Sequence, residues 1–324
     1  MSDLEPGDGR PQNNREWQLI EKVLLSAHQE NRRRRRWSVF FRFLGMAYLF
    51  LLLILFLPMT GDVAPTTSDK HTALVEVNGV IAEQNEASAD RIVTGLRDAF
   101  EADNSEAVLL RINSPGGSPV QSGQIYREIQ RLREKHPEKK LYAAITDMGA
   151  SGAYYVAAAA DRIYADPASI VGSIGVIMSG FGFTEAIDEL GVERRLLTAG
   201  ENKAMMDPFQ PVDPQQKEHV QTMLTEIHDQ FIEAVKEGRG DRLVSPEKNN
   251  LFSGLFWTGQ KSVDLGLTDG LKSPGQVARD VVGAKDIVNY TPRKNPLDEL
   301  MKRFGARVGA GLADALGLQE TRLR

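Results

Sequence analysis

The stretch from Leu141 to Ala160 constrains this chain most, because a buried strand, a glycine-flanked serine and a helix follow one another there. Residues 141–146 form a short apolar run that is typical of a buried strand. Residues 153–160 are rich in alanine and lack glycine and proline, which favours a helix. Ser151 therefore falls on the turn between them, where unpaired backbone N–H groups can stabilise an anion.

Two roles are open for Ser151 on this segment alone. Serine is a preferred N-cap residue, so its hydroxyl would simply cap the helix. The small neighbours Gly149 and Gly152 would equally leave the hydroxyl accessible, as a serine nucleophile requires. The nucleophile elbow of α/β-hydrolases is excluded, because Ala153 stands where that motif has its second glycine.

The surrounding segments predict an α/β domain with a mostly parallel sheet, because apolar strand-like runs alternate with helical segments. The expected strands cover residues 72–81, 107–113, 141–146, two short runs within 161–180, and 192–198; the expected helices cover 87–101, 120–135, 153–160, 183–190 and 215–236. In such sheets ligands bind beyond the carboxyl ends of the strands. Ser151 and the turn Ser114–Gly117 both follow strands at that edge, which favours the nucleophile role for Ser151.

The S-P-G-G turn at Ser114–Gly117 leaves a strand and enters a helix. Its two glycines allow the backbone to approach a substrate and to direct N–H groups toward it. The same residues also suit an ordinary tight turn, and the sequence does not decide between the two. Their spacing matches neither the dinucleotide fingerprint nor the P-loop, so nucleotide binding has little support.

The composition narrows the possible chemistry. The chain has no cysteine, which excludes disulfides, thiolate metal sites and a cysteine nucleophile. Its five histidines show no metal-binding spacing, and we expect His219 and His228 at the surface of a polar helix. We therefore expect no metal and no organic cofactor. The formal net charge of −5 and the acidic main domain argue against nucleic acid as a partner.

Lys203 is the candidate general base. No histidine is suitably placed, so a serine nucleophile here would need a lysine to take its proton. Lys203 lies in a predicted loop directly before Ala204, Met205 and Met206. Most loop lysines are simply solvated. Apolar surroundings, however, favour the neutral amine that a general base must be.

The N-terminal part of the chain predicts a single membrane anchor. Five arginines, Arg32–Arg36, precede an apolar segment at residues 38–57 that is interrupted only by Arg42. Twenty helical residues span about 30 Å, enough to cross a bilayer. The basic run should remain in the cytoplasm. A cleaved signal peptide has less support, because no A-x-A site follows.

The domain organisation follows from this topology. The expected parts are a basic cytoplasmic segment at 1–37, a transmembrane helix at 38–57, a linker at 58–70, a globular domain at 71–290 beyond the membrane, and an amphipathic tail at 291–324. The tail is interrupted by glycines, so we expect it to dock against a partner rather than to enter the membrane.

Four motifs, in this order, resemble the signal peptide peptidase A family of the ClpP/crotonase superfamily: N-S-P-G-G, G-A-S-G-A-Y-Y, A-D-P-A-S-I-V-G-S-I-G-V-I and A-G-E-N-K. The resemblance covers residues 71–285. It implies a fold of repeated ββα units and a serine protease with a Ser–Lys dyad. It matches Ser151 to the nucleophile, Lys203 to the base and Ser173 to the serine that orients the lysine, with Ser169 close by.

The resemblance also implies an oxyanion hole made by the N–H groups of Gly117 and Gly152. Ala153 departs from the glycine of many relatives, which should alter the shape of the pocket more than its chemistry. The chain has one serine motif and one lysine motif, half of what the longer members carry. We therefore expect a closed homo-oligomeric ring in which Ser151 of one subunit faces Lys203 of its neighbour.

The sequence thus predicts a serine endopeptidase anchored in the bacterial inner membrane, with its catalytic domain in the periplasm. Its expected substrates are signal-peptide remnants or other short apolar peptides. One alternative is a crotonase-like acyl-CoA enzyme, which is disfavoured because coenzyme A is cytosolic and such enzymes need neither Ser151 nor Lys203. The other is a catalytically inactive membrane scaffold that retains the protease fold.

Overall fold

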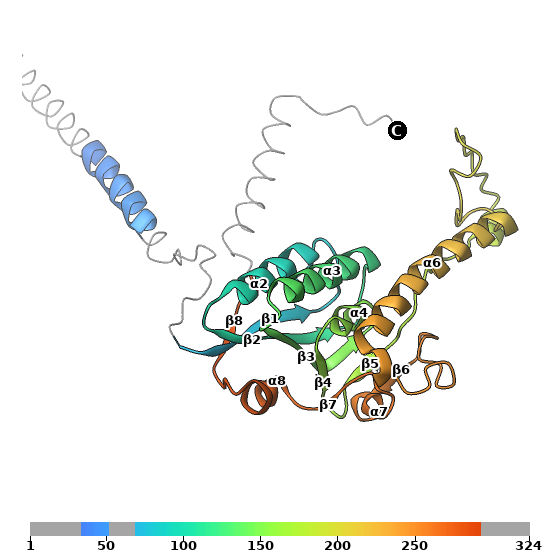
Figure 1. Cartoon of the computed structure of the whole chain (residues 1–324). Coiled ribbons are helices and arrows are strands. Elements are labelled where there is room, and N and C mark those ends of the chain that lie inside the picture. The colour runs from blue at the N-terminus through green and yellow to red at the C-terminus, as the bar shows by residue number, and fades with distance from the viewer. Residues whose placement is uncertain (1–33, 52–68, 293–324) are drawn as a thin grey trace, which may run out of the picture. The chain divides into compact units, whose positions relative to one another are not determined.

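The computed structural model describes residues 34–51 and 69–292 (Figure 1). Residues 34–51 form a helix. Within the two described ranges, we find no helix that is both long enough and apolar enough to cross a membrane. Residues 52–57 of the predicted span and residues 293–324 of the predicted tail lie outside the described ranges.

The chain divides into two compact units, Met1–Gly61 with Lys294–Arg324 and Asp62–Arg293. The second unit contains an eight-stranded sheet. Its strands are β1 (His71–Asn78), β2 (Ser105–Ser114), β3 (Lys140–Ala150), β4 (Arg162–Ala165), β5 (Ile170–Gly172), β6 (Phe256–Thr258), β7 (Gly270–Leu271) and β8 (Ile287–Asn289). They lie in the order β6-β5-β3-β2-β1-β8, with β4 beside β3 and β7 beside β4. Every pair is parallel except β5 and β6.

Helices cover both faces of this sheet, as continuous apolar strands require. They are α2 (Ala89–Glu101), α3 (Pro119–Lys135) and α4 (Gly152–Ala158) on one face, and α8 (Pro274–Gln276) with the π-helical turn Val277–Val282 on the other. Figure 1 shows α2 and α3 on one side of the strands and α8 on the opposite side. The predicted α/β class is confirmed.

Strand β2 shows how the two faces are formed. Val108, Leu110 and Ile112 belong to the large core cluster on the α2 and α3 side. Leu109 belongs to a smaller cluster with Val277 on the other side. Successive side chains of a strand point to opposite faces, so a strand that is apolar on both faces supplies both cores.

Two sequence-based expectations differ from the structure. Residues 192–198 were expected to form a strand, but they form none, and Leu197 is 98% exposed. A strand is stable only beside a pairing neighbour, and the sheet offers no strand to this segment. The ββα repeat is likewise absent from the first three strands. Each of them is followed by a single helix, because parallel neighbours need a crossover connection.

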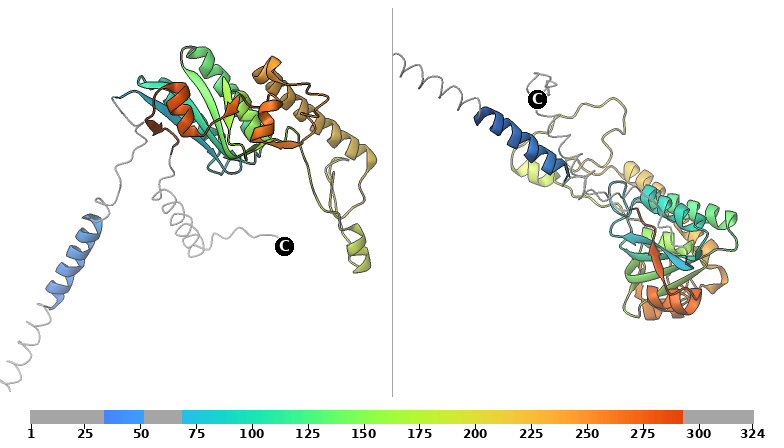
Figure 2. Two further views of the ribbon diagram at one scale, coloured as in Figure 1. Left: turned by 90° about the horizontal axis from the view of Figure 1, so that it is seen from below. Right: turned by 90° about the vertical axis from the view of Figure 1, so that its left-hand side faces the viewer.

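A long projection, residues 177–219, leaves the sheet after β5 and returns through the N-terminal part of α6 (Pro214–Arg239); we call it the arm. Figures 1 and 2 show it extending away from the strands, with the short helix α5 (Thr184–Glu189) at its far part. Its large apolar side chains are exposed rather than packed. They include Ile177, Met178, Phe181, Leu190, Val192, Leu197 and Val212.

Candidate active site

Ser151 occupies a strained turn between β3 and α4. Its backbone has φ 53° and ψ −128°, a conformation that a non-glycine residue seldom adopts. The Ser151 N–H donates to the carbonyl oxygen of Gly172 at 2.8 Å, and its own carbonyl accepts the N–H of Tyr154 at 2.8 Å. The side chain makes no capping hydrogen bond. Among the described residues the Ser151 hydroxyl has no hydrogen-bond partner, although the residue stands at the N-cap position.

The S-P-G-G turn lies directly against Ser151. Gly116 and Gly117 have φ values of 93° and 150°, in the region that favours glycine. A Cβ on Gly116 would stand 2.6 Å from the nitrogen of Gly152 and 2.8 Å from Cβ of Ser151. Only glycine permits this close approach. Ile81 holds the turn in place, because its N–H donates to Gly116 O and its carbonyl accepts the N–H of Ser118, both at 2.8 Å.

Two backbone donors are left unpaired by this arrangement. The N–H groups of Gly117 and Gly152 have no acceptor among the described residues. Both glycines line the same pocket as Ser151. An unpaired pair of amides beside a serine hydroxyl suits an oxyanion that forms on a carbonyl attacked by that serine.

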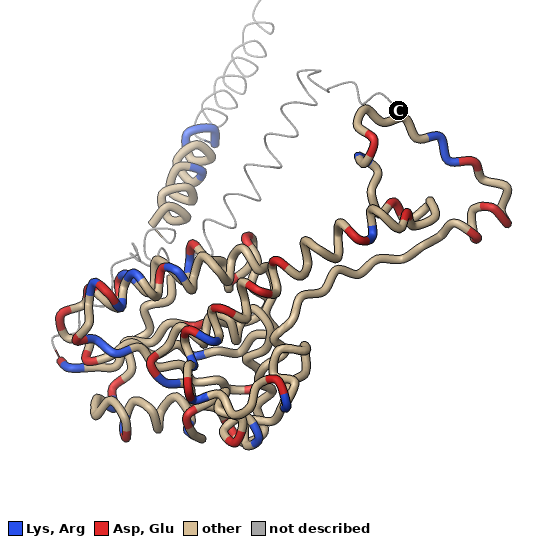
Figure 3. The backbone as a smooth tube through the Cα atoms, turned by 45° about the vertical axis from the view of Figure 1, so that its right-hand side comes forward, with Lys and Arg blue, Asp and Glu red and all other residues tan. Residues whose placement is uncertain are grey.

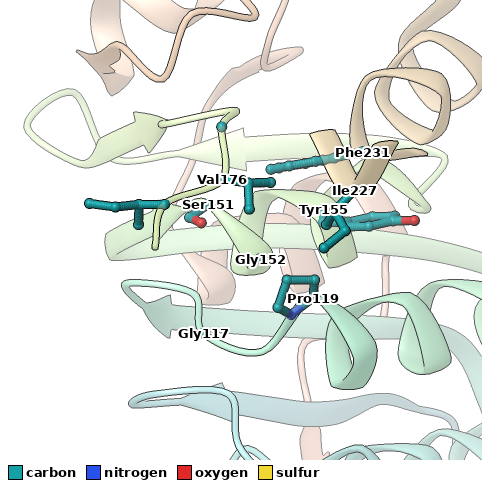
Figure 4. Close-up of a pocket in the computed structure, with 10 residues that line it drawn as sticks. Gly117, Pro119, Ser151, Gly152, Tyr155, Val176, Ile227 and Phe231 are labelled. Carbon is teal, nitrogen blue, oxygen red and sulfur yellow. The ribbon is translucent and has the colours of Figure 1, made fainter. Parts of the chain in front are cut away.

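The rest of the pocket is mostly apolar (Figure 4). Its further lining residues are Pro119, Tyr155, Gly175, Val176, Ile177, Ile227 and Phe231. The rings of Tyr155 and Phe231 stack, with centroids 4.8 Å apart and planes 10° from parallel. Burial raises the pKa of Tyr155 above its ordinary value, so this hydroxyl stays neutral. The pocket is thus shaped for an uncharged, apolar side chain.

Ser169 and Ser173 have different environments. The buried Ser169 hydroxyl contacts the carbonyl oxygens of Ile145 and Thr146 and accepts the N–H of Asp166 at 3.0 Å. Ser173 has φ 54°, and only its backbone N–H is bonded, to Leu255 O at 2.7 Å. Within the described part of the chain, the Ser173 hydroxyl has no partner. Ser173 is therefore the serine that remains available to orient another group.

Lys203 lies on the arm, in a turn where its backbone N–H donates to Gly200 O at 3.1 Å. Its side chain is exposed, and Lys203 is not among the residues that line the Ser151 pocket. Across residues 34–51 and 69–292, no hydrogen bond or ion pair joins it to Ser151 or Ser173. The structure of one chain therefore brings Ser151, Gly117 and Gly152 together but leaves Lys203 apart from them.

An ion pair and a ring contact give this part of the arm a local structure. Arg194 pairs with Asp207 at 2.7 Å, and its guanidinium lies 5.1 Å from the ring centre of Phe209. The ring of Phe183 lies 5.7 Å from that of Phe209. These contacts hold residues 207–209, which directly follow the turn that carries Lys203, against Phe183 and Arg194.

The sequence interpretation missed two residues near the pocket, Tyr155 and His228. Tyr155 follows Ser151 by four residues, so one turn of α4 brings both to the same side. His228 was expected at the surface, but it is half-buried, and its Nε2 donates to Ile174 O at 3.2 Å. The sequence could have indicated this position, because His228 is adjacent to Ile227 and lies three residues before Phe231, about one helical turn away.

Comparisons with known proteins identify the family of this chain. The model of peptidase family S49 matches residues 133–287. A putative protease of Synechocystis, slr0021, is 30% identical over 265 residues, which are 79% of this chain and 91% of that protein. A putative signal peptide peptidase of Enterococcus faecium is 30% identical over 210 residues, 62% of this chain and 60% of that protein. The chain belongs to peptidase family S49, which confirms the resemblance found in the sequence.

Two further matches need separate description. A Brucella abortus protein named Na(+)/H(+) antiporter NhaA is 48% identical over 230 residues, 68% of this chain but only 31% of that protein. The chain thus spans less than a third of that relative. A solved structure of a stomatin-specific protease mutant, 1510-N, covers 70% of this chain at 14% identity and a TM-score of 0.44. A similarity this low supports no further conclusion.

Proposed function

We propose that this protein is a serine endopeptidase in which Ser151 is the nucleophile. The observation that carries the proposal is the free Ser151 hydroxyl beside the unpaired N–H groups of Gly117 and Gly152 in one pocket. Membership of a peptidase family agrees with it. The acyl-CoA alternative has no such support. The antiporter name of the Brucella relative belongs to a protein more than three times as long as the shared segment, and we do not transfer it.

The proposed reaction is an acyl transfer. Ser151 Oγ attacks the peptide carbonyl while Lys203 Nζ, as the neutral amine, takes the hydroxyl proton. The negative charge that develops on the carbonyl oxygen receives hydrogen bonds from the N–H groups of Gly117 and Gly152. The protonated Lys203 then gives its proton to the leaving amine. Water, activated by the same lysine, hydrolyses the ester and regenerates Ser151.

The base of this reaction is proposed to come from a second copy of the chain. Lys203 is exposed on the arm and stands outside the Ser151 pocket of its own subunit. The arm exposes large apolar side chains, such as Ile177, which is 85% exposed, and such surfaces are typical of interfaces. Residues 173–184 carry no charge, and Figure 3 shows the segment that leaves the sheet free of charged residues. A ring in which each arm packs on the next subunit would bury these side chains and bring Lys203 to Ser173 and Ser151.

The proposed substrates are short apolar peptides, including the remnants of signal peptides. The walls formed by Tyr155, Ile227 and Phe231 favour an apolar side chain next to the cleaved bond. The described residues that line the pocket are all uncharged, so they offer no partner to an acidic or basic side chain. The name of the Enterococcus relative agrees with this substrate class.

We further propose that residues 38–57 anchor the protein in the inner membrane with the peptidase domain in the periplasm. The proposal rests on the apolar sequence and on Arg32–Arg36 before it. Protease added to intact spheroplasts should cut the linker at residues 58–70. If the linker is cut only after the membrane is lysed, the orientation is the reverse.

The proposed activity is tested by labelling with a serine-directed phosphonate. Wild-type protein should become labelled and should hydrolyse an apolar peptide, and Ser151→Ala should do neither. Ser253→Ala is the matched control, because Ser253 is exposed and lies outside the pocket. An unlabelled wild-type protein that also leaves apolar peptides intact would favour the inactive scaffold.

A further inference from the structure

The two segments that join the arm to the rest of the domain form opposite walls of the Ser151 pocket. Gly175, Val176 and Ile177 belong to the segment that leaves β5. Ile227 and Phe231 belong to α6, through which the arm returns. Figure 4 shows Val176 close to Ser151, with Ile227 and Phe231 beside Tyr155. The width of the pocket therefore depends on the spacing between residues 173–177 and α6.

The path of the backbone at residues 172–175 depends on contacts with other segments. Gly172 and Ser173 have φ values of 107° and 54°, and the Ser173 conformation is unfavourable for a residue with a side chain. Such conformations persist only where surrounding contacts determine them. One contact is with the neighbouring loop, where the N–H of Gly254 donates to Ile174 O at 3.0 Å.

A second contact comes from α6. The half-buried His228 donates from Nε2 to the same Ile174 oxygen at 3.2 Å. A carbonyl oxygen has two lone pairs, so it can accept both donors. Within the described residues, this is the one hydrogen bond between residues 173–177 and α6. The donor nitrogen must carry a hydrogen, which both the Nε2–H neutral form and the charged imidazole provide.

We propose that His228 is a positioning residue that fixes the spacing between the two pocket walls. By holding Ile174, it sets the place of Val176 against Ile227. Without this bond, the remaining hydrogen bonds of Ser173 and Ile174 are those with Leu255 and Gly254 among the described residues, so the backbone at 175–177 can move away from α6 while the Ile174 side chain stays buried. The proposal rests on the proposed peptidase function, but the contact itself acts in the absence of substrate.

The test compares His228→Gln, His228→Asn and His228→Leu in the full chain. The glutamine amide can present an N–H at a reach similar to that of Nε2, whereas the asparagine amide is too short and leucine has no donor. For an apolar peptide, the Leu and Asn variants should raise KM about tenfold, as the loss of one hydrogen bond implies. The Gln variant should stay within about threefold of wild type. His219→Leu, an exposed histidine of the same helix, is the control.

The second measurement is the hydrolysis of a small activated ester that has no side chain to fill the pocket. Its kcat/KM should change by less than about twofold in the Leu and Asn variants, because it needs Ser151 but not the pocket walls. Equal losses for ester and peptide, or a Gln variant as poor as the Asn variant, would overturn the positioning role.

Amide hydrogen exchange separates this inference from the proposed function. In the substrate-free protein, residues 173–177 should exchange faster in His228→Leu than in wild type or His219→Leu. Unchanged exchange in this segment refutes the contact even if the enzyme is active. Faster exchange in a protein that cleaves no peptide would instead reject the proposed function and retain the contact.

Discussion

Gly152 and Ser122 lie close together beside the proposed oxyanion hole. A Cβ built on Gly152 overlaps Ser122 Oγ and lies 3.3 Å from the nitrogen of Gly117. Ser122 Oγ is buried and has no hydrogen-bond partner among the described residues. We expect Gly152→Ala to displace its own N–H from the oxyanion and to lower kcat about 10²–10³-fold, the effect of losing one such donor. Steady-state kinetics with an apolar peptide measures this.

Ser122→Ala provides the matching compensation, because it removes the atom that the new methyl group would overlap. The double variant should recover most of the kcat lost in Gly152→Ala. Ser122→Ala alone should leave the free energy of unfolding unchanged within about 0.5 kcal/mol or raise it, since the buried hydroxyl pairs with nothing. A double variant as slow as Gly152→Ala would show that overlap with Ser122 is not the cause.

Lys203 must lose its proton before it can act as a base. Arginine keeps its charge at every pH at which the protein is folded, so Lys203→Arg should hydrolyse no peptide. The exposed side chain should tolerate the change without loss of stability. The measurement is peptide hydrolysis together with the melting temperature. Near wild-type hydrolysis by Lys203→Arg would remove Lys203 from the reaction.

At the scale of elements, the inner end of α6 is fixed by a buried ion pair. Arg239 is 1% exposed, pairs with Asp269 at 2.7 Å and donates two hydrogen bonds to Gly266 O. Asp269 also accepts the N–H of Ile163 in β4 at 2.7 Å. Arg239→Met should destabilise the domain by about 3–5 kcal/mol, because the largely buried Asp269 carboxylate loses its main partner. Chemical denaturation measures this, with exposed Arg279→Met as the control.

The same pair gives the domain an acid-sensitive contribution to stability. Burial raises the pKa of Asp269, but its hydrogen bonds with Arg239 and the nearby positive charges outweigh burial and hold the pKa below its ordinary value. A carboxyl whose pKa is lower in the folded than in the unfolded state stabilises the fold at pH values above its unfolded-state pKa of about 4. This stabilisation is lost as the pH falls through the folded-state pKa. The stability difference between wild type and Asp269→Asn should therefore be largest at neutral pH and shrink below about pH 4. A difference that is constant from pH 7 to pH 3 would contradict the assignment.

At the scale of the whole molecule, the arm separates Lys203 from the pocket of its own chain. Ser151→Ala and Lys203→Ala should each be inactive. If subunits share sites in a closed ring, random equal mixing should restore about a quarter of them, because each site then needs one intact residue from each of two neighbours. The measurement is peptide hydrolysis after co-expression of the two variants.

The control for this experiment is proof that the rings are mixed. Differently tagged variants should be purified through both tags in succession before the assay. Doubly tagged rings without activity would reject the shared site and leave Ser151 and the oxyanion hole unaffected. Activity in such rings cannot arise from complete single-chain sites, since neither chain has one.

The sequence by itself determined the parts that depend on local patterns. Apolar runs of strand length alternating with helical segments predicted the α/β sheet and the place of Ser151 at the end of β3, and both agree with the structure. The glycines of Ser114–Gly117 and Gly152 indicated where the backbone can approach another group closely. These features are local because side-chain periodicity and positive φ are properties of a few consecutive residues.

Only the tertiary structure decided the features that depend on residues far apart in the chain. The Ser151 hydroxyl is free rather than capping because the carbonyl of distant Gly172 holds its backbone in a strained turn. The Ser169 hydroxyl is hydrogen-bonded within the fold, whereas the Ser173 hydroxyl has no partner among the described residues. Residues 192–198 have a strand-like sequence but no strand, because a strand needs a partner that the sequence pattern cannot supply. His228 became a contact of the pocket only because α6 packs beside Ile174, and such packing between distant segments is not encoded in local periodicity.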